Sequence, residues 1–135
     1  MSDEKIRQLL ASAKIIALVG ASSKEQRPSY RVMAYLQQAG YRVIPVNPGQ
    51  EGKQLLGEKV YARLADIDLP IDIVDIFRRA DTVQEVIDEA IAVKAGAVWM
   101  QLGIVNEDAA LVAREAGLKV VMDRCTKIEH ARLLG

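Results

Sequence analysis

Five short stretches of the chain are almost continuously apolar, and they predict the strands of a buried sheet. They are rich in β-branched residues and do not alternate between apolar and polar positions. This pattern is typical of strands that are covered on both faces, as in a parallel sheet with helices on each side. The five predicted strands are Ile15–Gly20, Arg42–Asn47, Asp72–Phe77, Ala97–Gln101 and Lys119–Asp123.

The segments between the strands carry apolar residues at helical spacing. The clearest is Asp81–Ala95, where apolar residues recur every third or fourth position and where Asp81 and Gln84 are spaced to cap the helix start reciprocally. Pro28 suits the first turn of a second helix, and Asn106 suits the N-cap of a third. A glycine follows the predicted end of each of these helices, where it accepts the left-handed backbone that ends a helix.

Two more helices are predicted near the ends of the chain. Asp3–Ala13 precedes the first strand, and Thr126–Leu134 follows the last strand and opens with Thr126 and Glu129 at the spacing of a capping box. Strands and helices therefore alternate, which predicts an α/β fold: a doubly wound parallel sheet of five strands with helices on both faces. Only Gly49–Ile67 lacks a clear period, so we expect a long loop to replace all or part of the second crossover helix.

The length and composition are those of one ordinary domain. The 135 residues are 50 % hydrophobic and 27 % charged, and a chain of this size buries about 68 % of its unfolded surface around one core. We therefore expect residues 1–135 to form a single domain. The sequence contains neither a signal peptide nor an apolar run of the ~20 residues needed to span a bilayer. These features predict a cytoplasmic protein that has no membrane partner.

Charge and the rarest residues exclude several classes of function. The 18 basic residues equal the 18 acidic ones, so no net charge favours nucleic acid, and any anion site must be local. The single cysteine, Cys125, excludes a disulfide framework. The single histidine, His130, excludes a multi-histidine metal site, and we expect no metal-binding residues, although the sequence leaves a carboxylate-bound Mg²⁺ open.

Small and polar residues follow the predicted strands. Ligands of an open parallel sheet bind outside the carboxyl ends of its strands, so these residues form the candidate site. Gly20–Arg27 suits a phosphate, because small residues let the backbone approach and a helix start carries partial positive charge. Arg78 and Arg79 follow the third strand, and guanidinium groups bind phosphate through paired hydrogen bonds. The alternative is that Ser22 and Ser23 cap the helix and that the arginines are solvated.

A nicotinamide or flavin dinucleotide is the first ligand to weigh for such a sheet, and the sequence disfavours it. Gly20 is the only glycine between the first strand and its helix, so the G-x-G-x-x-G fingerprint is absent. The second strand ends at Asn47 and Pro48, where a dinucleotide domain places an acidic residue for the ribose hydroxyls. The pattern therefore favours another phosphorylated ligand, and a sensor of NAD(P) or another nucleotide remains an alternative.

Six motifs occur in an order that points to one family. They are VGAS at Val19–Ser22, RPSY at Arg27–Tyr30, VIPVNP at Val43–Pro48, DIVDIFRR at Asp72–Arg79, WMQLG at Trp99–Gly103 and MDRCTKIEH at Met122–His130. Together they span about residues 10–132 and resemble the stand-alone bacterial CoA-binding proteins. The same Rossmann-like domain opens the α subunit of succinyl-CoA synthetase and the ADP-forming acyl-CoA synthetases.

The resemblance implies that coenzyme A, free or acylated, lies across the carboxyl edge of the sheet. The synthetases tend to read Pro-Gly-Lys after the second strand, whereas this chain reads Pro48-Gly49-Gln50, so the phosphate contact of that lysine is not implied here. Their domain with the phosphorylated histidine does not fit in 135 residues, so we do not expect this chain to make acyl-CoA alone. The residues implied to lie near the ligand are Gly20, Ala21, Ser22, Ser23, Arg27, Pro28, Ser29, Asn47, Pro48, Phe77, Arg78, Arg79, Gln101 and Gly103, with Cys125 as a further candidate.

Cys125 and His130 invite an interpretation as nucleophile and base. Cys125 precedes a predicted helix start, which lowers the pKa of a thiol. His130 lies about one helical turn further along, and the capping box accounts for Glu129, so we expect the pair to be structural. The leading hypothesis is therefore a non-catalytic CoA-binding carrier, sensor or regulatory module. The alternative of another class is a small CoA-dependent enzyme or thiol-exchange protein that uses Cys125.

Overall fold

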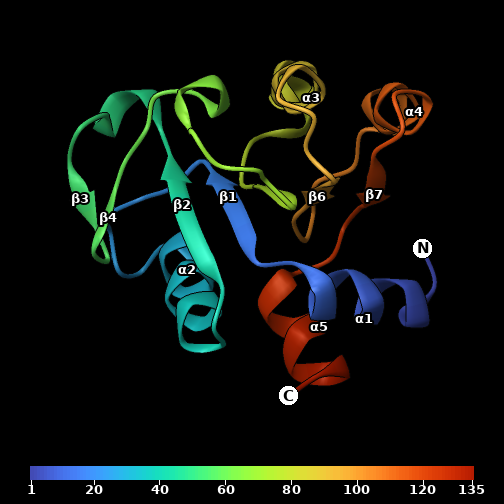
Figure 1. Ribbon diagram of the computed structural model, residues 1–135, viewed down its shortest axis with the longest axis horizontal. Helices are drawn as coiled ribbons and strands as arrows, with labels where there is room; N and C mark the ends of the chain where they lie inside the picture. The colour runs from blue at the N-terminus through green and yellow to red at the C-terminus, as the bar shows by residue number, and fades with distance from the viewer.

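The computed structural model describes residues 1–135 as a parallel sheet between two layers of helices (Figure 1). Its strands are β1 (Ile15–Val19), β2 (Arg42–Val46), β5 (Ile73–Ile76), β6 (Ala97–Met100) and β7 (Lys119–Val121). Their order across the sheet is β2-β1-β5-β6-β7, and all neighbours are parallel. The chain moves outward from β1 to β2, crosses back to β5 and continues to β7. This is the predicted doubly wound, Rossmann-like fold.

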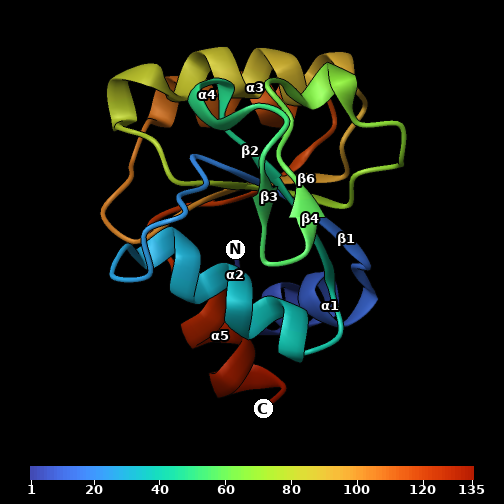
Figure 2. The same ribbon diagram turned by 90° about the vertical axis from the view of Figure 1, so that its left-hand side faces the viewer.

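Helices cover both faces of the sheet. Figures 1 and 2 show α3 (Val83–Ala92) and α4 (Glu107–Glu115) on one face, with α1 (Asp3–Ser12), α2 (Pro28–Gln38) and α5 (Thr126–Leu133) on the other. Successive strand residues face opposite layers: in β6, Val98 and Met100 join the apolar cluster under α3 and α4, whereas Ala97 and Trp99 join the cluster under α1 and α2. Burial on both faces explains why the strands are continuously apolar. None of the helices combines the length and the apolar character that a bilayer span requires.

The connection between β2 and β5 contains no α-helix, as the missing periodicity predicted. Two turns of 3-10 helix, η1 (Pro48–Gln50) and η2 (Leu64–Asp66), flank a small antiparallel hairpin of β3 (Gln54–Leu55) and β4 (Glu58–Lys59). Figure 2 turns this hairpin toward the viewer. Another 3-10 turn, η3 (Ala80–Thr82), leads from β5 into α3.

The reciprocal cap predicted from Asp81 and Gln84 is wrong. The turn η3 runs directly into α3, so a carbonyl of η3 accepts from the first N–H of the helix and no side chain caps it. Gln84 donates instead to Asp88, one turn along the helix, at 2.9 Å. Asp81 forms an exposed ion pair with Arg79, at 3.4 Å between nitrogen and oxygen.

Two of the three glycines predicted to end helices have left-handed backbone. They are Gly40, with φ +106, and Gly117, with φ +92. After α3 the prediction is wrong, because Lys94 adopts this conformation with φ 58. Gly96 instead allows close packing, since a Cβ at this position would lie 3.0 Å from the backbone oxygen of Asp72.

Candidate functional site

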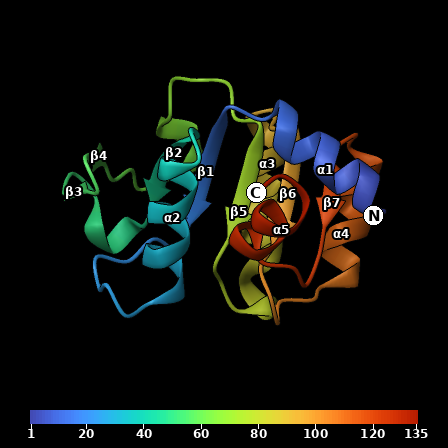
Figure 3. The same cartoon turned by 90° about the horizontal axis from the view of Figure 1, so that it is seen from below.

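A cavity of about 720 Å³ lies along the carboxyl ends of the sheet strands. Its 16 lining residues come from the loops after β1, β2, β5, β6 and β7 and from the N-terminal parts of α2 and α5. In Figure 3 the loops that follow β1, β5, β6 and β7 gather along the lower side of the molecule. The volume is typical of a site for one small organic ligand, about 300–1,000 Å³.

Most of the residues expected near the ligand line this cavity. Three do not: Ser23 and Gly103 are exposed outside its lining, and Pro48 borders a separate cavity of about 170 Å³. The predicted residues that do line it are Gly20, Ala21, Ser22, Arg27, Pro28, Ser29, Asn47, Phe77, Arg78, Arg79, Gln101 and Cys125.

Four apolar residues also line the cavity; Leu102 lies within Gln101–Gly103, a segment expected to flank the ligand, and the other three were not expected there. The four are Val32, Leu102, Ile104 and Ile128. Leu102 is 64 % exposed and Ile128 is 54 % exposed, so part of the rim is apolar and open to solvent. The signal for Ile104 was present, because it lies three residues after a predicted strand, at the carboxyl edge of the sheet.

The cavity is cationic although the chain as a whole is neutral. Arg27, Arg78 and Arg79 line it, and no aspartate or glutamate does. Arg79 is exposed and already pairs with Asp81. Arg78 differs, because its Nε is buried and has no hydrogen-bond partner. Leaving a buried donor unpaired costs about 1–3 kcal/mol, more for a charged group, so the site suits an anionic acceptor beside Arg78.

The loop after β1 turns the backbone sharply into the cavity. Gly20 has φ +92, and the N–H groups of Gly20 and Ala21 both donate to the carbonyl of Val46, at 3.0 and 3.3 Å. The hydroxyl of Ser22 accepts from the N–H of Lys24 at 3.1 Å. This hydroxyl therefore shapes the loop and does not cap α2.

The start of α2 is uncapped at the cavity. Its N-cap residue is Arg27, Pro28 occupies the first turn as predicted, and no side chain accepts from the first-turn N–H groups. The first turn also contains no acidic residue. The alternative in which Ser22 or Ser23 caps α2 is therefore wrong. The partial positive charge of the helix start is free to attract an anion.

Asn47 joins two of the cavity loops. Its Nδ2 donates to the carbonyl of Ala21 at 2.7 Å, and its Oδ1 accepts from the N–H of Gly49 at 2.9 Å. Both polar ends of the side chain are thus engaged within the protein. An asparagine can donate and accept at once, which gives a structural reason for its place at the end of β2.

A buried polar network lies at the β6–β7 end of the cavity. Asp75, in the central strand β5, is fully buried, and its two oxygens accept from Gln101 Nε2 at 2.5 Å and from Thr126 Oγ1 at 2.9 Å. Gln101 Nε2 also donates to Thr126 Oγ1 at 3.0 Å. Burial raises the pKa of Asp75 to about 7, although the bonds from Gln101 and Thr126 partly oppose the shift. The sequence analysis missed Asp75, whose signal was a charged residue inside an apolar strand.

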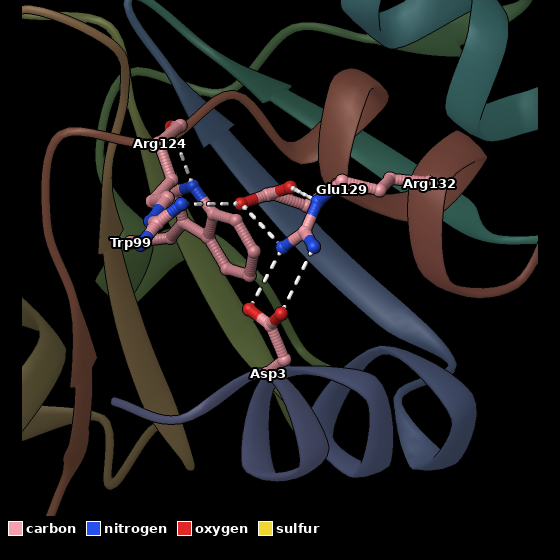
Figure 4. A network of polar contacts seen from close by, with 5 residues as sticks. All are labelled: Asp3, Trp99, Arg124, Glu129 and Arg132. Carbon is pink, nitrogen blue, oxygen red and sulfur yellow. Dashed lines mark hydrogen bonds and ion pairs between the residues drawn. The ribbon is translucent and has the colours of Figure 1, made fainter.

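Ion pairs hold the start of α5 in place, as Figure 4 shows. Buried Glu129 accepts from Arg124 at 3.1 Å and from Arg132 at 2.8 Å, and Arg132 also binds Asp3 of α1. The hydrogen bond from Arg132 is the main reason that the pKa of Glu129 lies below its usual value. The Trp99 indole donates to the carbonyl of Arg124 at 2.8 Å. These bonds fix the loop that carries Cys125.

The capping box predicted for Thr126 and Glu129 is wrong. The N-cap position belongs to Cys125, and no side chain makes a capping bond there. Thr126 lies inside the helix and donates to Asp75, while Glu129 binds two arginines. Buried tertiary partners have therefore taken both side chains away from the helix terminus.

No hydrogen bond joins Cys125 to His130, and only Cys125 lines the cavity. Cys125 is half-buried and lines the cavity. His130 lies outside the lining, where its Nδ1 is 2.9 Å from the hydroxyl oxygen of Tyr35. Its ring also packs edge-on against Tyr35 and Tyr41, with centroids 5.5 and 5.7 Å apart. The imidazole thus joins α5 to α2.

Comparison with known families identifies the domain. A family model described as a CoA binding domain matches residues 14–131. The chain belongs to this family. The match spans all the cavity loops, from Gly20 to Cys125, and confirms the resemblance inferred from the six sequence motifs.

Relatives of this CoA binding domain have nearly the same length. Uncharacterized protein YneT of Bacillus subtilis (strain 168) is 42 % identical over 130 residues, which are 96 % of this chain and 95 % of that protein. The structure of cell-free ID.343 from Thermus thermophilus matches with a TM-score of 0.95 at 42 % identity, over 99 % of this chain and 100 % of that one. A hypothetical protein from Pyrococcus horikoshii OT3 matches with a TM-score of 0.94 at 44 % identity, over 100 % and 94 %.

The same fold occurs as part of a much larger enzyme. The dinucleotide forming acetyl-coenzyme A synthetase 1 of Ca. Korarchaeum cryptofilum matches with a TM-score of 0.71 at 23 % identity. The match covers 82 % of this chain and 26 % of the synthetase. At this identity the likeness concerns the fold of the CoA binding domain alone.

Proposed function

We propose that the chain binds coenzyme A or an acyl-CoA in the cavity and acts as a non-catalytic carrier, sensor or regulatory module. The observation that carries the proposal is Arg78: it lines a cavity that has three arginines and no acidic residue, and its buried Nε has no hydrogen-bond partner. Membership of the CoA binding domain family supports coenzyme A as the ligand.

The strand order suggests how the ligand lies. Asn47 follows β2 at one edge of the sheet, Gly20 and Arg78 follow the adjacent strands β1 and β5, and Cys125 follows β7 at the far edge. The uncapped start of α2 and the guanidinium of Arg78 are the anion-binding groups, so the phosphates belong near β1 and β5. The pantetheine arm then extends toward β6 and β7, where the lining includes Leu102 and Ile128.

The surroundings of Cys125 support a binding role over a catalytic one. One common way to activate a catalytic thiol is a base within hydrogen-bonding distance. The imidazole of His130 is engaged by Tyr35, and the carboxylate of Glu129 is engaged by Arg124 and Arg132. Neither the imidazole nor the carboxylate forms a hydrogen bond with the Cys125 thiol.

Calorimetry with four ligands tests the proposal. The purified protein is titrated with CoA, acetyl-CoA, NAD and ATP under the same conditions. We expect CoA or acetyl-CoA to bind at least tenfold more tightly than NAD, because the sequence has neither the dinucleotide fingerprint nor an acidic residue after β2. Equal or tighter binding of NAD would overturn the assignment. Native mass spectrometry of freshly purified protein gives an independent check, since a retained ligand identifies itself by mass.

A further inference from the structure

Gln101 is almost wholly buried, yet it lines the cavity. It is 4 % exposed and lies directly after β6, beside the lining residue Leu102. Its amide nitrogen donates to both Asp75 and Thr126. A primary amide has two N–H groups, so both donors are used inside the protein.

The charge of Asp75 decides which way this amide points. An ionised carboxylate can only accept hydrogen bonds, so it binds the NH₂ end of Gln101 and rejects the carbonyl end. Thr126 strengthens this selection, because its hydroxyl donates to Asp75 and therefore accepts from Gln101. Both hydrogen bonds of the Gln101 side chain use Nε2, so its carbonyl oxygen Oε1 receives no hydrogen bond from the chain. Gln101 lines the cavity, and Oε1 is therefore available to a ligand.

We propose that Asp75 is a positioning residue for the side-chain amide of Gln101. It holds the amide so that Oε1 faces the cavity, where this oxygen accepts a hydrogen bond from a donor on the pantetheine arm of coenzyme A. This inference rests on the proposed function. The arm is favoured over the nucleotide because Gln101 follows β6, whereas the anion-binding groups follow β1 and β5. The donor is then an amide N–H or the terminal S–H, the hydrogen-bond donors along the distal part of that arm.

The pairing also disfavours one class of group at this position. A ligand carbonyl placed against Oε1 would face another acceptor and leave both oxygens unpaired. If the ligand donor is the thiol, the Asp75–Gln101 pair favours free CoA over a thioester, which has no S–H. If the ligand donor is an amide N–H, Gln101 binds CoA and its thioesters alike.

The test compares Asp75→Asn, Gln101→Met and the double variant by calorimetry at pH 8, where Asp75 is largely ionised. The ligands are CoA, acetyl-CoA and 3′,5′-ADP, which lacks the arm. The asparagine of Asp75→Asn can donate as well as accept, so the Gln101 amide is free to turn over. We expect Asp75→Asn to weaken CoA about tenfold and to leave 3′,5′-ADP unchanged. The loss extends to acetyl-CoA if the donor is an amide and is confined to CoA if it is the thiol.

The double variant separates positioning from a general structural effect. If Asp75 acts through Gln101, then Asp75→Asn has no further effect on CoA affinity once Gln101 is methionine. Equal losses in both backgrounds, or an equal loss for 3′,5′-ADP, would overturn the inference. Should Asp75→Asn fail to fold, Gln101→Met alone must weaken CoA and spare 3′,5′-ADP.

Failure of this inference is distinguishable from failure of the proposed function. If the wild-type protein does not bind CoA, the proposed function is wrong. If it binds CoA and Asp75→Asn binds it equally well, only the role of Asp75 is wrong. The ¹⁵N and ¹H shifts of the Gln101 side-chain amide give a readout without ligand. We expect them to move in Asp75→Asn, and unchanged shifts would contradict the positioning role.

Discussion

The carbonyl oxygen of Phe77 occupies the place where a side chain at Gly20 would begin. A Cβ on Gly20 would lie 2.1 Å from that oxygen, and the backbone of Gly20 is left-handed with φ +92. This contact joins the loop after β1 to the loop after β5, and both loops line the cavity. The spacing of the candidate phosphate-binding groups therefore depends on the absence of a side chain at Gly20.

We predict that Gly20→Ala lowers the free energy of unfolding by at least about 3 kcal/mol, because the backbone strain adds to a clash that only main-chain movement can relieve. Gly40→Ala is the matched control, since Gly40 has φ +106 but a Cβ there would meet no atom within 4 Å. We expect Gly40→Ala to cost only the conformational term, about 1–2 kcal/mol. Urea denaturation measures both, and equal losses would contradict a specific role for the Phe77 contact.

Arg78 provides the direct test of the anion-binding cavity. We predict that Arg78→Ala weakens CoA binding by about 1.5–3 kcal/mol, the range for a hydrogen bond to a charged group. The melting temperature of the Arg78→Ala variant should stay close to that of the wild type, because the buried Nε of Arg78 has no hydrogen-bond partner to lose. Arg79→Ala is the control: Arg79 is exposed and paired with Asp81, so we expect a smaller loss of affinity. An unchanged dissociation constant for Arg78→Ala would remove Arg78 from the site.

The fold could be predicted from the sequence because its determinants are local. The apolar runs and helical periods correspond to the strands and helices of the structure. The residues selected by the rule that ligands bind at strand carboxyl ends, from Gly20 to Cys125, mostly line one cavity. The caps predicted at Gln84 and Thr126 were wrong for different reasons: at Gln84 the local turn η3 and Asp88 took the place of the cap, whereas at Thr126 a distant residue did. Thr126 fits a capping box by spacing, yet a carboxylate 51 positions away in sequence takes its hydroxyl.

The role of Gln101 shows a second limit. The family resemblance placed Gln101 near the ligand, but the direction of its amide depends on Asp75 in the neighbouring strand β5. Strand register sets that contact, because Asp75 pairs with Trp99 and thus lies near the end of β6. A charged residue in an apolar strand is a visible signal, but its partner becomes known only when the strands are aligned.

Asp75 also predicts how stability depends on pH. Its pKa is raised from 3.8 to about 7 in the folded protein. Between these values the folded protein holds a proton that the unfolded chain has lost, so the contribution of Asp75 to the free energy of unfolding falls as pH rises. The contribution is most favourable below about pH 4 and is lost by about pH 7. Between these pH values it lowers the free energy of unfolding by an amount on the order of 4 kcal/mol.

The variant Asp75→Asn removes this titration. We expect the difference in free energy of unfolding, variant minus wild type, to rise between pH 4 and pH 7, as measured by urea denaturation at several pH values. Asp88→Asn, on the exposed face of α3, should leave the pH dependence close to that of the wild type. A constant difference for Asp75→Asn across this range would mean that the carboxyl does not titrate there.

Cys125 is expected to exchange with a disulfide of the ligand. Its thiol is half-buried, lines the cavity and lies at the N-cap of α5. With CoA disulfide, the Cys125 thiolate attacks one sulfur, forms a protein–CoA disulfide and releases the other half as CoA thiolate. We predict the mass increase of one bound CoA in the wild-type protein and none in Cys125→Ser.

The same experiment distinguishes a cavity-directed reaction from a merely accessible thiol. Oxidised glutathione offers the same chemistry without the nucleotide, so faster modification by CoA disulfide at equal concentration indicates that the cavity holds the reagent near Cys125. Cys125→Ser should keep CoA affinity within about twofold, because we place the charge-assisted contacts, which are the strong ones, near Arg78 and α2 and not at Cys125. If the folded Cys125→Ser variant loses CoA binding, the thiol itself contacts the ligand. If CoA disulfide leaves the wild-type mass unchanged, Cys125 has only a structural role at the start of α5.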